Sequence, residues 1–159
     1  MGGRGSYSGS GLNTWNGKSS AGFTKTYEGK NGGFVYTENS RIELSNMNKS
    51  ERTKYNKEHD MCKHLANNGH TVVHLDDRKL SNGSYDILLD GKRAELKSLK
   101  GASNIGREGK SAIRKQKADL VVFKFKEINS NVHKQLNILA KKGIQGYYYK
   151  NGDGGLSKF

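Results

Sequence analysis

The chain has 159 residues, about the length of one domain, and 32% of them are hydrophobic, enough for a core of normal size in part of the chain. No apolar run approaches the roughly 18 residues of a transmembrane helix, and the single cysteine, Cys62, excludes an internal disulfide and a multi-cysteine zinc site. No apolar leader follows the first methionine, so we expect a cytoplasmic protein without a secretory signal peptide; delivery to a target cell by another route stays open. The 28 Lys and Arg against 15 Asp and Glu give a net charge of +13, which favours a polyanionic partner such as nucleic acid.

Residues 1–49 differ in composition from residues 50–159. The first segment is rich in Gly and Ser and begins without the apolar periodicity of a packed element. The stretches 23–27 and 34–36 flank a Gly-containing stretch at 28–33, which indicates a hairpin. We therefore divide the chain into an N-terminal segment, 1–49, and a domain, 50–159.

The domain alternates between helical and strand periodicity. Ser50 is predicted to cap a helix that ends near Asn68, where Gly69 stops it. Strands are expected at 70–75, 84–89, 92–99, 120–125 and 144–149, helices at 111–117 and 132–142, and a basic loop at 100–110. The order is αβββαβ followed by αβ, which predicts an α/β (α+β) fold with a mixed sheet flanked by helices.

The Asp90-Gly91 pair between two strands is the strongest short-range hairpin signal in the chain. A two-residue turn there would place Asp86 directly opposite Glu95, with Lys97 on the same face of the sheet. Like charges opposite one another destabilise a sheet, so the arrangement suggests a divalent cation between the two carboxylates. The alternative is a solvent-facing strand with mixed charges.

Glu58 lies on or beside the apolar stripe of the preceding helix, which includes Met61, Cys62 and Leu65. A carboxylate directed at the core needs a partner, because burial of an unpaired charge is strongly unfavourable. A metal ion shared with the two strand carboxylates would supply it. The alternatives are that Glu58 reaches water or pairs with a basic side chain.

These residues resemble the PD-(D/E)xK nuclease superfamily. The match consists of Asp86, eight intervening residues, Glu95-Leu96-Lys97 as the ExK element, and Glu58 on the helix before the sheet. It covers roughly residues 50–125 and is similar to the C-terminal nuclease domains of contact-dependent growth inhibition toxins, including tRNA-cleaving members. The sequence has no proline, so the first residue of the superfamily motif is missing.

The resemblance implies an αβββαβ core, a metal-dependent endonuclease and a cognate immunity protein. Glu58, Asp86, Glu95 and the backbone carbonyl of Leu96 would bind Mg²⁺ or Mn²⁺, which prefer oxygen ligands. Lys97 would hold the nucleophile or stabilise the charge that develops on the phosphate. The residues expected to bind nucleic acid are Arg107, Lys110, Arg114, Lys115, Gln116 and Lys117.

Two other functions stay open. In the first, the chain is a basic nucleic-acid-binding module in which the carboxylates are structural. In the second, it is a metal-independent RNase that uses histidines as general acid and base. Between substrates, the resemblance to toxin nuclease domains with tRNA-cleaving members favours tRNA slightly over DNA.

Overall fold

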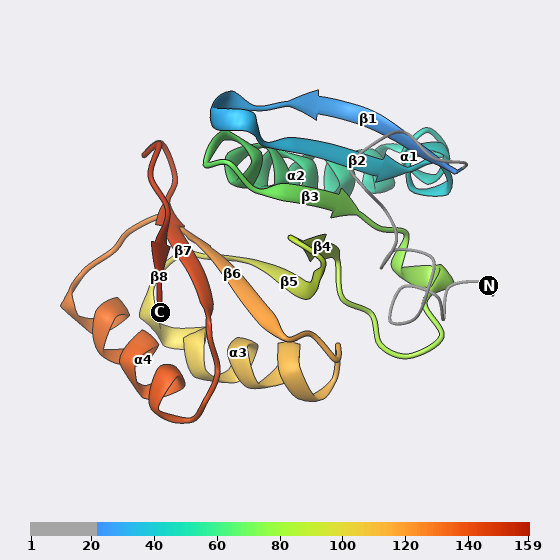
Figure 1. Cartoon of the computed structure of the whole chain (residues 1–159). Coiled ribbons are helices and arrows are strands. Elements are labelled where there is room, and N and C mark those ends of the chain that lie inside the picture. The colour runs from blue at the N-terminus through green and yellow to red at the C-terminus, as the bar shows by residue number, and fades with distance from the viewer. Residues whose placement is uncertain (1–21) are drawn as a thin grey trace.

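Strands from both halves of the chain form one mixed sheet in the computed structural model, which describes residues 22–159 (Figure 1). The strands are β1 (Phe23–Glu28), β2 (Phe34–Glu38), β3 (Thr71–His74), β4 (Ile87–Leu89), β5 (Lys92–Leu99), β6 (Leu120–Phe125), β7 (Gly146–Lys150) and β8 (Ser157–Lys158). Their spatial order is their order in the chain. The pairs β2–β3, β5–β6 and β6–β7 are parallel, and the other neighbours are antiparallel.

Helices cover both faces of this sheet (Figure 1). They are α1 (Asn39–Ser45), α2 (Lys49–Asn67), α3 (Ile105–Arg114) and α4 (Ser130–Lys141). Because side chains alternate along a strand, β6 contributes Leu120 and Val122 to the core under α2, and Val121 and Phe123 to the core under α3 and α4. The α/β fold and the order αβββαβ followed by αβ are as predicted.

Helix α2 begins earlier than predicted. Its N-cap is Asn48, whose side chain accepts a hydrogen bond from the Glu51 N–H at 2.8 Å, and not Ser50, which lies in the first turn. At the other end, Gly69 has a φ of 89°, the left-handed conformation that stops a helix. The C-terminal end of the helix is therefore where the sequence placed it.

The prediction of a basic loop at 100–110 is wrong, because α3 already begins at Ile105. Ile105, Gly109 and Ala112 recur at helical spacing and are buried. A Cβ atom on Gly109 would lie 2.6 Å from a methyl carbon of Leu139 in α4, so this glycine lets two helices approach. Sequence analysis interpreted the glycine as a loop signal, whereas the structure uses it for packing.

The described part of the N-terminal segment belongs to the same sheet as the rest of the chain. Strands β1 and β2 form an antiparallel pair at the predicted hairpin, and β2 continues the sheet through β3. Residues 1–21 of the Gly- and Ser-rich segment lie outside the described residues. Within residues 22–159, no helix combines the length and apolar character needed to cross a membrane.

Candidate active site

The turn between β4 and β5 sets the register of the candidate site. Asp90 and Gly91 have φ values of 51° and 86°, which is the left-handed backbone of a two-residue hairpin turn. The ladder pairs Leu89 with Lys92 and Ile87 with Ala94, as the Asp-Gly pair predicted. The ladder ends at the Ile87–Ala94 pair, so the predicted pairing of Asp86 directly opposite Glu95 is not part of it.

Asp86 lies just before the first residue of β4, where the strand leaves the ladder. Its backbone N–H donates to the carbonyl of Ala94 at 3.1 Å, and its carboxylate accepts from the Leu96 N–H at 2.9 Å. The Glu95 carboxyl group lies close to it. Burial first, and then the charges of Glu95 and Glu58, raise the pKa of Asp86 well above its ordinary value.

Glu95 is the second carboxyl group of the pair and is only 6% exposed. Burial raises its pKa, although its interaction with the Asp86 carboxyl group and the nearby Lys97 ammonium act in the opposite direction. Its Oε1 atom is buried and has no hydrogen-bond partner among residues 22–159. Buried polar atoms of native proteins are rarely left in this state, so the pair has unused capacity to bind a ligand.

Lys97 lies two residues further along β5 and contacts two carboxylates. Its Nζ is 3.3 Å from Oε2 of Glu95 and 3.2 Å from Oε1 of Glu108, and its side chain is 16% exposed. Burial lowers the pKa of Lys97, but these two carboxylates outweigh it and the net shift is upward. Lys97 is therefore a fixed cation beside the carboxyl pair, as the sequence placed it.

Glu108 is a site residue that the sequence analysis missed. It lies in the first turn of α3, and its pKa is lowered, because Lys97 and Arg107 together outweigh the effect of burial. The signal was an acidic residue within a strongly basic stretch. It was overlooked because the surrounding residues were interpreted as a loop.

Glu58 has other partners than the predicted ones. Its Oε1 atom accepts from Nε2 of His74 at 2.9 Å and lies 3.5 Å from an Nη atom of Arg41. Burial acts to raise the pKa of Glu58, but His74 and Arg41 outweigh it and lower the pKa. In the part of the chain that the structure describes, no group of three His, Cys, Asp or Glu side chains is arranged to hold a metal ion together. Glu58 therefore pairs with His74 and Arg41 and does not form the cluster with Asp86 and Glu95 that the sequence analysis predicted.

Most histidines required for an acid–base RNase are engaged in internal contacts. His74 is fully buried, and His59, 7% exposed, lies 2.8 Å from the Thr26 hydroxyl and stacks on Tyr55. Nitrogen atoms of His64 and His70 lie 2.7 Å from the Gly155 carbonyl oxygen and 2.6 Å from Asp90. These contacts account for the histidines as structural groups.

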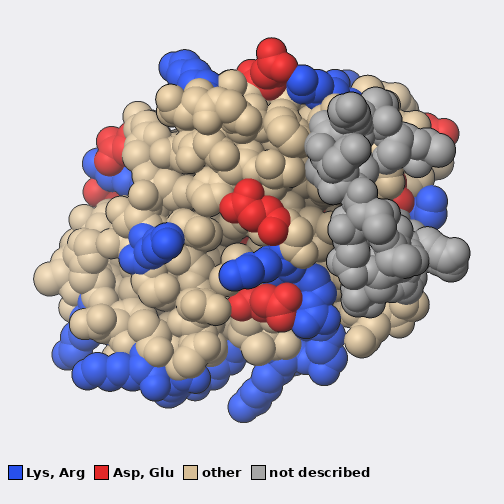
Figure 2. Space-filling model, in the orientation of Figure 1, with Lys and Arg blue, Asp and Glu red and all other residues tan. Residues whose placement is uncertain are grey.

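Four of the six predicted nucleic-acid-binding residues line one cavity beside α3. Its volume is about 620 Å³, and its basic side chains are those of Arg107, Lys110, Arg114 and Lys115. Glu108 also lines it and thereby connects it to Lys97. Figure 2 shows Lys and Arg gathered along the lower edge of the molecule, near the helices α3 and α4 of Figure 1. The structure places the other two predicted residues, Gln116 and Lys117, beyond the end of α3 and outside the lining of this cavity.

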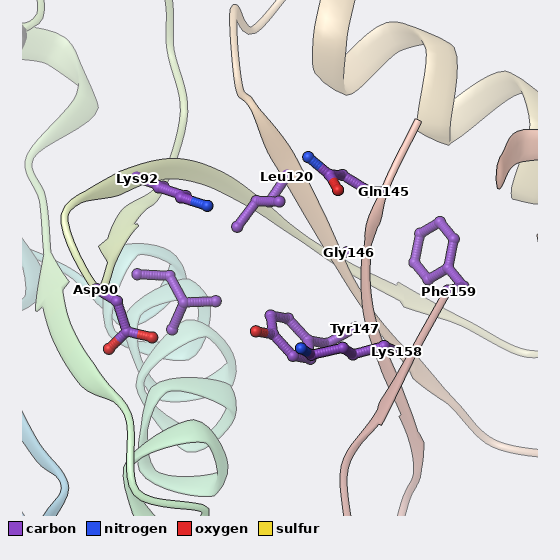
Figure 3. Close-up of a pocket in the computed structure, with 9 residues that line it drawn as sticks. Asp90, Lys92, Leu120, Gln145, Gly146, Tyr147, Lys158 and Phe159 are labelled. Carbon is purple, nitrogen blue, oxygen red and sulfur yellow. The ribbon is translucent and has the colours of Figure 1, made fainter. Parts of the chain in front are cut away.

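A smaller pocket of about 180 Å³ lies where β5, β6 and β7 begin (Figure 3). Tyr147 and Lys158, paired across β7 and β8, lie side by side, with Asp90 and Lys92 on the opposite side of the pocket. Lys92 begins β5, whereas Lys97 is near its end. The pocket is therefore separate from the carboxyl pair.

Comparison with known proteins supports the fold. No protein-family model matches the sequence, and no curated protein matches it. One solved chain, from the CdiA-CT/CdiI toxin and immunity complex of Burkholderia pseudomallei, is similar with a TM-score of 0.55 and 14% sequence identity. The similarity covers 70% of this chain and 88% of that one. The two chains share a fold.

Proposed function

We propose that this protein is a toxin-like, metal-dependent endonuclease that hydrolyses phosphodiester bonds in nucleic acid. The observation that carries the proposal is the contact of Asp86 with Glu95 beside Lys97. Two buried carboxyl groups in contact are unfavourable for folding, because each disfavours ionisation of the other. Such a pair at the edge of a basic surface is typical of a site at which ligand binding compensates for the repulsion.

The residues present fit a divalent cation. Asp86, Glu95 and the backbone carbonyl of Leu96 are hard oxygen donors of the kind that Mg²⁺ and Mn²⁺ prefer, and Oε1 of Glu95 is buried without a partner within the described residues. When bound, such an ion supplies an acidified water and neutralises negative charge on a phosphate. Both contacts of Glu58, with His74 and Arg41, use its Oε1 atom.

The remaining chemistry belongs to side chains of the chain itself. Lys97, held between Glu95 and Glu108, is positioned to donate hydrogen bonds to the oxygens of a phosphate as negative charge develops on them. The basic side chains beside α3 would bind neighbouring phosphates and fix the register of the substrate. In this proposal, the residues at β4 and β5 carry out the reaction, and the basic residues of α3 bind the substrate.

Substrate and partner follow the same proposal. We favour tRNA slightly over DNA, and we expect a cognate immunity protein. The similarity in fold to a chain of a toxin and immunity complex supports both the toxin role and the partner.

The test is incubation of the protein with total tRNA and with plasmid DNA, each with Mg²⁺, Mn²⁺ or EDTA. We expect fragments of tRNA with either metal and intact substrate in EDTA. Full activity in EDTA would overturn the metal-dependent mechanism and favour histidine catalysis. Binding without cleavage under every condition would leave a nucleic-acid-binding module.

A further inference from the structure

A second basic pocket lies between α2 and the strands β5 and β6. Its volume is about 410 Å³, and three lysines, Lys54, Lys57 and Lys124, line it together with Glu58, Met61, Leu96 and Ser98. The sequence analysis assigned no role to any of the three lysines. Within residues 22–159, none of them has a carboxylate within ion-pair distance.

Lys124 is the most unusual of the three. It occupies β6, where the other five residues are buried and apolar. Its register places it beside Ser98 of β5 and Tyr149 of β7, so it is in the interior of the sheet and not at an edge. Alternation places it on the α2 face with Leu120 and Val122. A cation at such a position without an internal partner is unfavourable unless an anion from outside compensates for it.

The charge balance of the pocket is positive. Lys54 and Lys57 are three residues apart on α2, where like charges repel. Of the described residues in the lining, Glu58 is the only acidic one, and His74 and Arg41 already offset its charge. The pocket therefore attracts an anion.

The chemistry of the lining points to a phosphate and not to a base. Ser98 adds a hydroxyl donor, whereas Met61 and Leu96 are the apolar residues of the lining. Among the described residues, the lining contains no aromatic ring on which a base could stack. The volume is in the range of pockets that hold one small ligand, which suits a single nucleotide unit.

The pocket and the carboxyl pair meet at β5 but lie on opposite faces of it, because Leu96 and Ser98 alternate with Glu95 and Lys97. The side chain of Leu96 lies under α2, and its backbone N–H holds the carboxylate of Asp86 at 2.9 Å. We propose that Lys54, Lys57 and Lys124 bind a backbone phosphate of the nucleic acid other than the one that is cleaved. This inference rests on the proposed function, and it gives the substrate a contact on the α2 face in addition to the one at α3.

The experiment measures binding separately from cleavage. Fluorescein-labelled tRNA and a single-stranded DNA are titrated in EDTA with the wild type and with Lys54→Gln, Lys57→Gln and Lys124→Gln, and anisotropy is recorded at several salt concentrations. We expect each substitution to weaken binding by roughly 3- to 10-fold and to lower the slope of log affinity against log salt by about 0.7. Lys134→Gln on the exposed face of α4 is the matched control, with an expected change of less than about twofold.

The outcomes separate this inference from the proposed function. Variants of the pocket lysines that bind as tightly as the control overturn the inference even if the wild type cleaves RNA. Weakened binding in those variants supports it even if the wild type cleaves nothing with Mg²⁺ or Mn²⁺, in which case the endonuclease proposal falls alone. A wild type that binds neither nucleic acid overturns the inference. Lys57→Gln lies on an exposed helix surface, so its result does not depend on tolerance of a change inside the sheet.

Discussion

Two regions of this protein hold a buried carboxyl group in opposite ways. At β4 and β5, Asp86 and Glu95 lie close together, their pKa values are raised, and one oxygen of Glu95 has no partner in the described part of the chain. Under α2, Glu58 contacts His74 and Arg41, and its pKa is lowered. The positive charge near Asp86 and Glu95 thus does not compensate for their two carboxylates, whereas His74 and Arg41 compensate for the carboxylate of Glu58.

The difference indicates what each region is for. A carboxylate with two cationic or hydrogen-bonding partners is compensated, and removal of one partner is strongly destabilising because it leaves charge buried without compensation. A carboxyl pair that remains underpaired is held in place by the fold, although it reduces stability in the absence of a ligand. We therefore expect substitutions in the first region to affect cleavage and substitutions in the second to affect folding.

The largest expected effect is on cleavage by Lys97→Ala. Removal of the ammonium that lies 3.3 Å from Glu95 should lower the cleavage rate by roughly a hundredfold to a thousandfold, because stabilisation of the developing phosphate charge is lost. Circular dichroism and nucleic-acid affinity should change little, since one lysine is a small part of the net charge of +13. Lys92→Ala, at the exposed start of the same strand, is the control and should cut normally. Normal cutting by Lys97→Ala would remove the catalytic role of this region.

The next effect concerns the stability of the second region. Arg41→Met removes one partner of Glu58 but keeps much of the buried stem, so the free energy of unfolding should fall by about 3–4 kcal/mol. Arg52→Met, at an exposed position on α2, should change it by less than about 0.5 kcal/mol. Urea denaturation measures both. The comparison breaks if Arg41→Met keeps its stability but loses cleavage, because Glu58 would then act with the first region.

A smaller effect is the pH dependence that His59 contributes. Burial first, and then the charges of His74 and Lys63, lower its pKa from 6.5 to about 4, so the folded state favours the neutral ring. The stability that this provides is present above pH 6.5 and is lost as the pH falls through about 4, by on the order of 2–3 kcal/mol. His59→Gln should flatten the stability curve between pH 6.5 and pH 4, whereas His133→Gln, at an exposed position, should leave it unchanged. An equally steep curve for His59→Gln would assign the acid sensitivity to another group.

The smallest effect tests the repulsion between the two strand carboxyls. The pKa of Asp86 is raised above 3.8, so its contribution to stability is complete below that pH and is lost as the pH rises through the higher folded value. At neutral pH without metal, Asp86→Asn should therefore stabilise the protein by about 1 kcal/mol while abolishing cleavage and the rise in Tm that Mg²⁺ produces in the wild type.

Asp119→Asn is the control for that substitution, with the opposite sign. Asp119 is exposed, and its pKa is lowered by Arg93 at 2.8 Å. Its replacement should leave stability unchanged or lower it by up to about 1 kcal/mol. Thermal melts with and without Mg²⁺ measure both variants. If Asp86→Asn melts earlier than the wild type and keeps the full Mg²⁺ shift, Asp86 belongs to a structural bridge.

The sequence alone determined the local geometry of the candidate site. Asp90 and Gly91 tolerate positive φ, and that property of two adjacent residues specifies the hairpin register from Leu89–Lys92 to Ile87–Ala94, which brings Asp86 near Glu95. Alternation along β5 then places Lys97 on the same face. The order of helices and strands also follows from the sequence, because the hydrophobic periodicity that distinguishes a helix from a strand depends only on residues close together in the chain.

Tertiary structure decided which distant groups meet. Arg41, which pairs with Glu58, comes from the segment that composition had separated from the domain, and His74 comes from the strand that follows α2. Glu108 reaches Lys97 because it lies in the first turn of α3, which starts at Ile105, six residues earlier than predicted. The helix includes Gly109 because packing of this glycine on Leu139 outweighs the low helix propensity of glycine. Sequence patterns report dihedral preferences and faces, whereas the partner of a buried charge depends on which elements pack together.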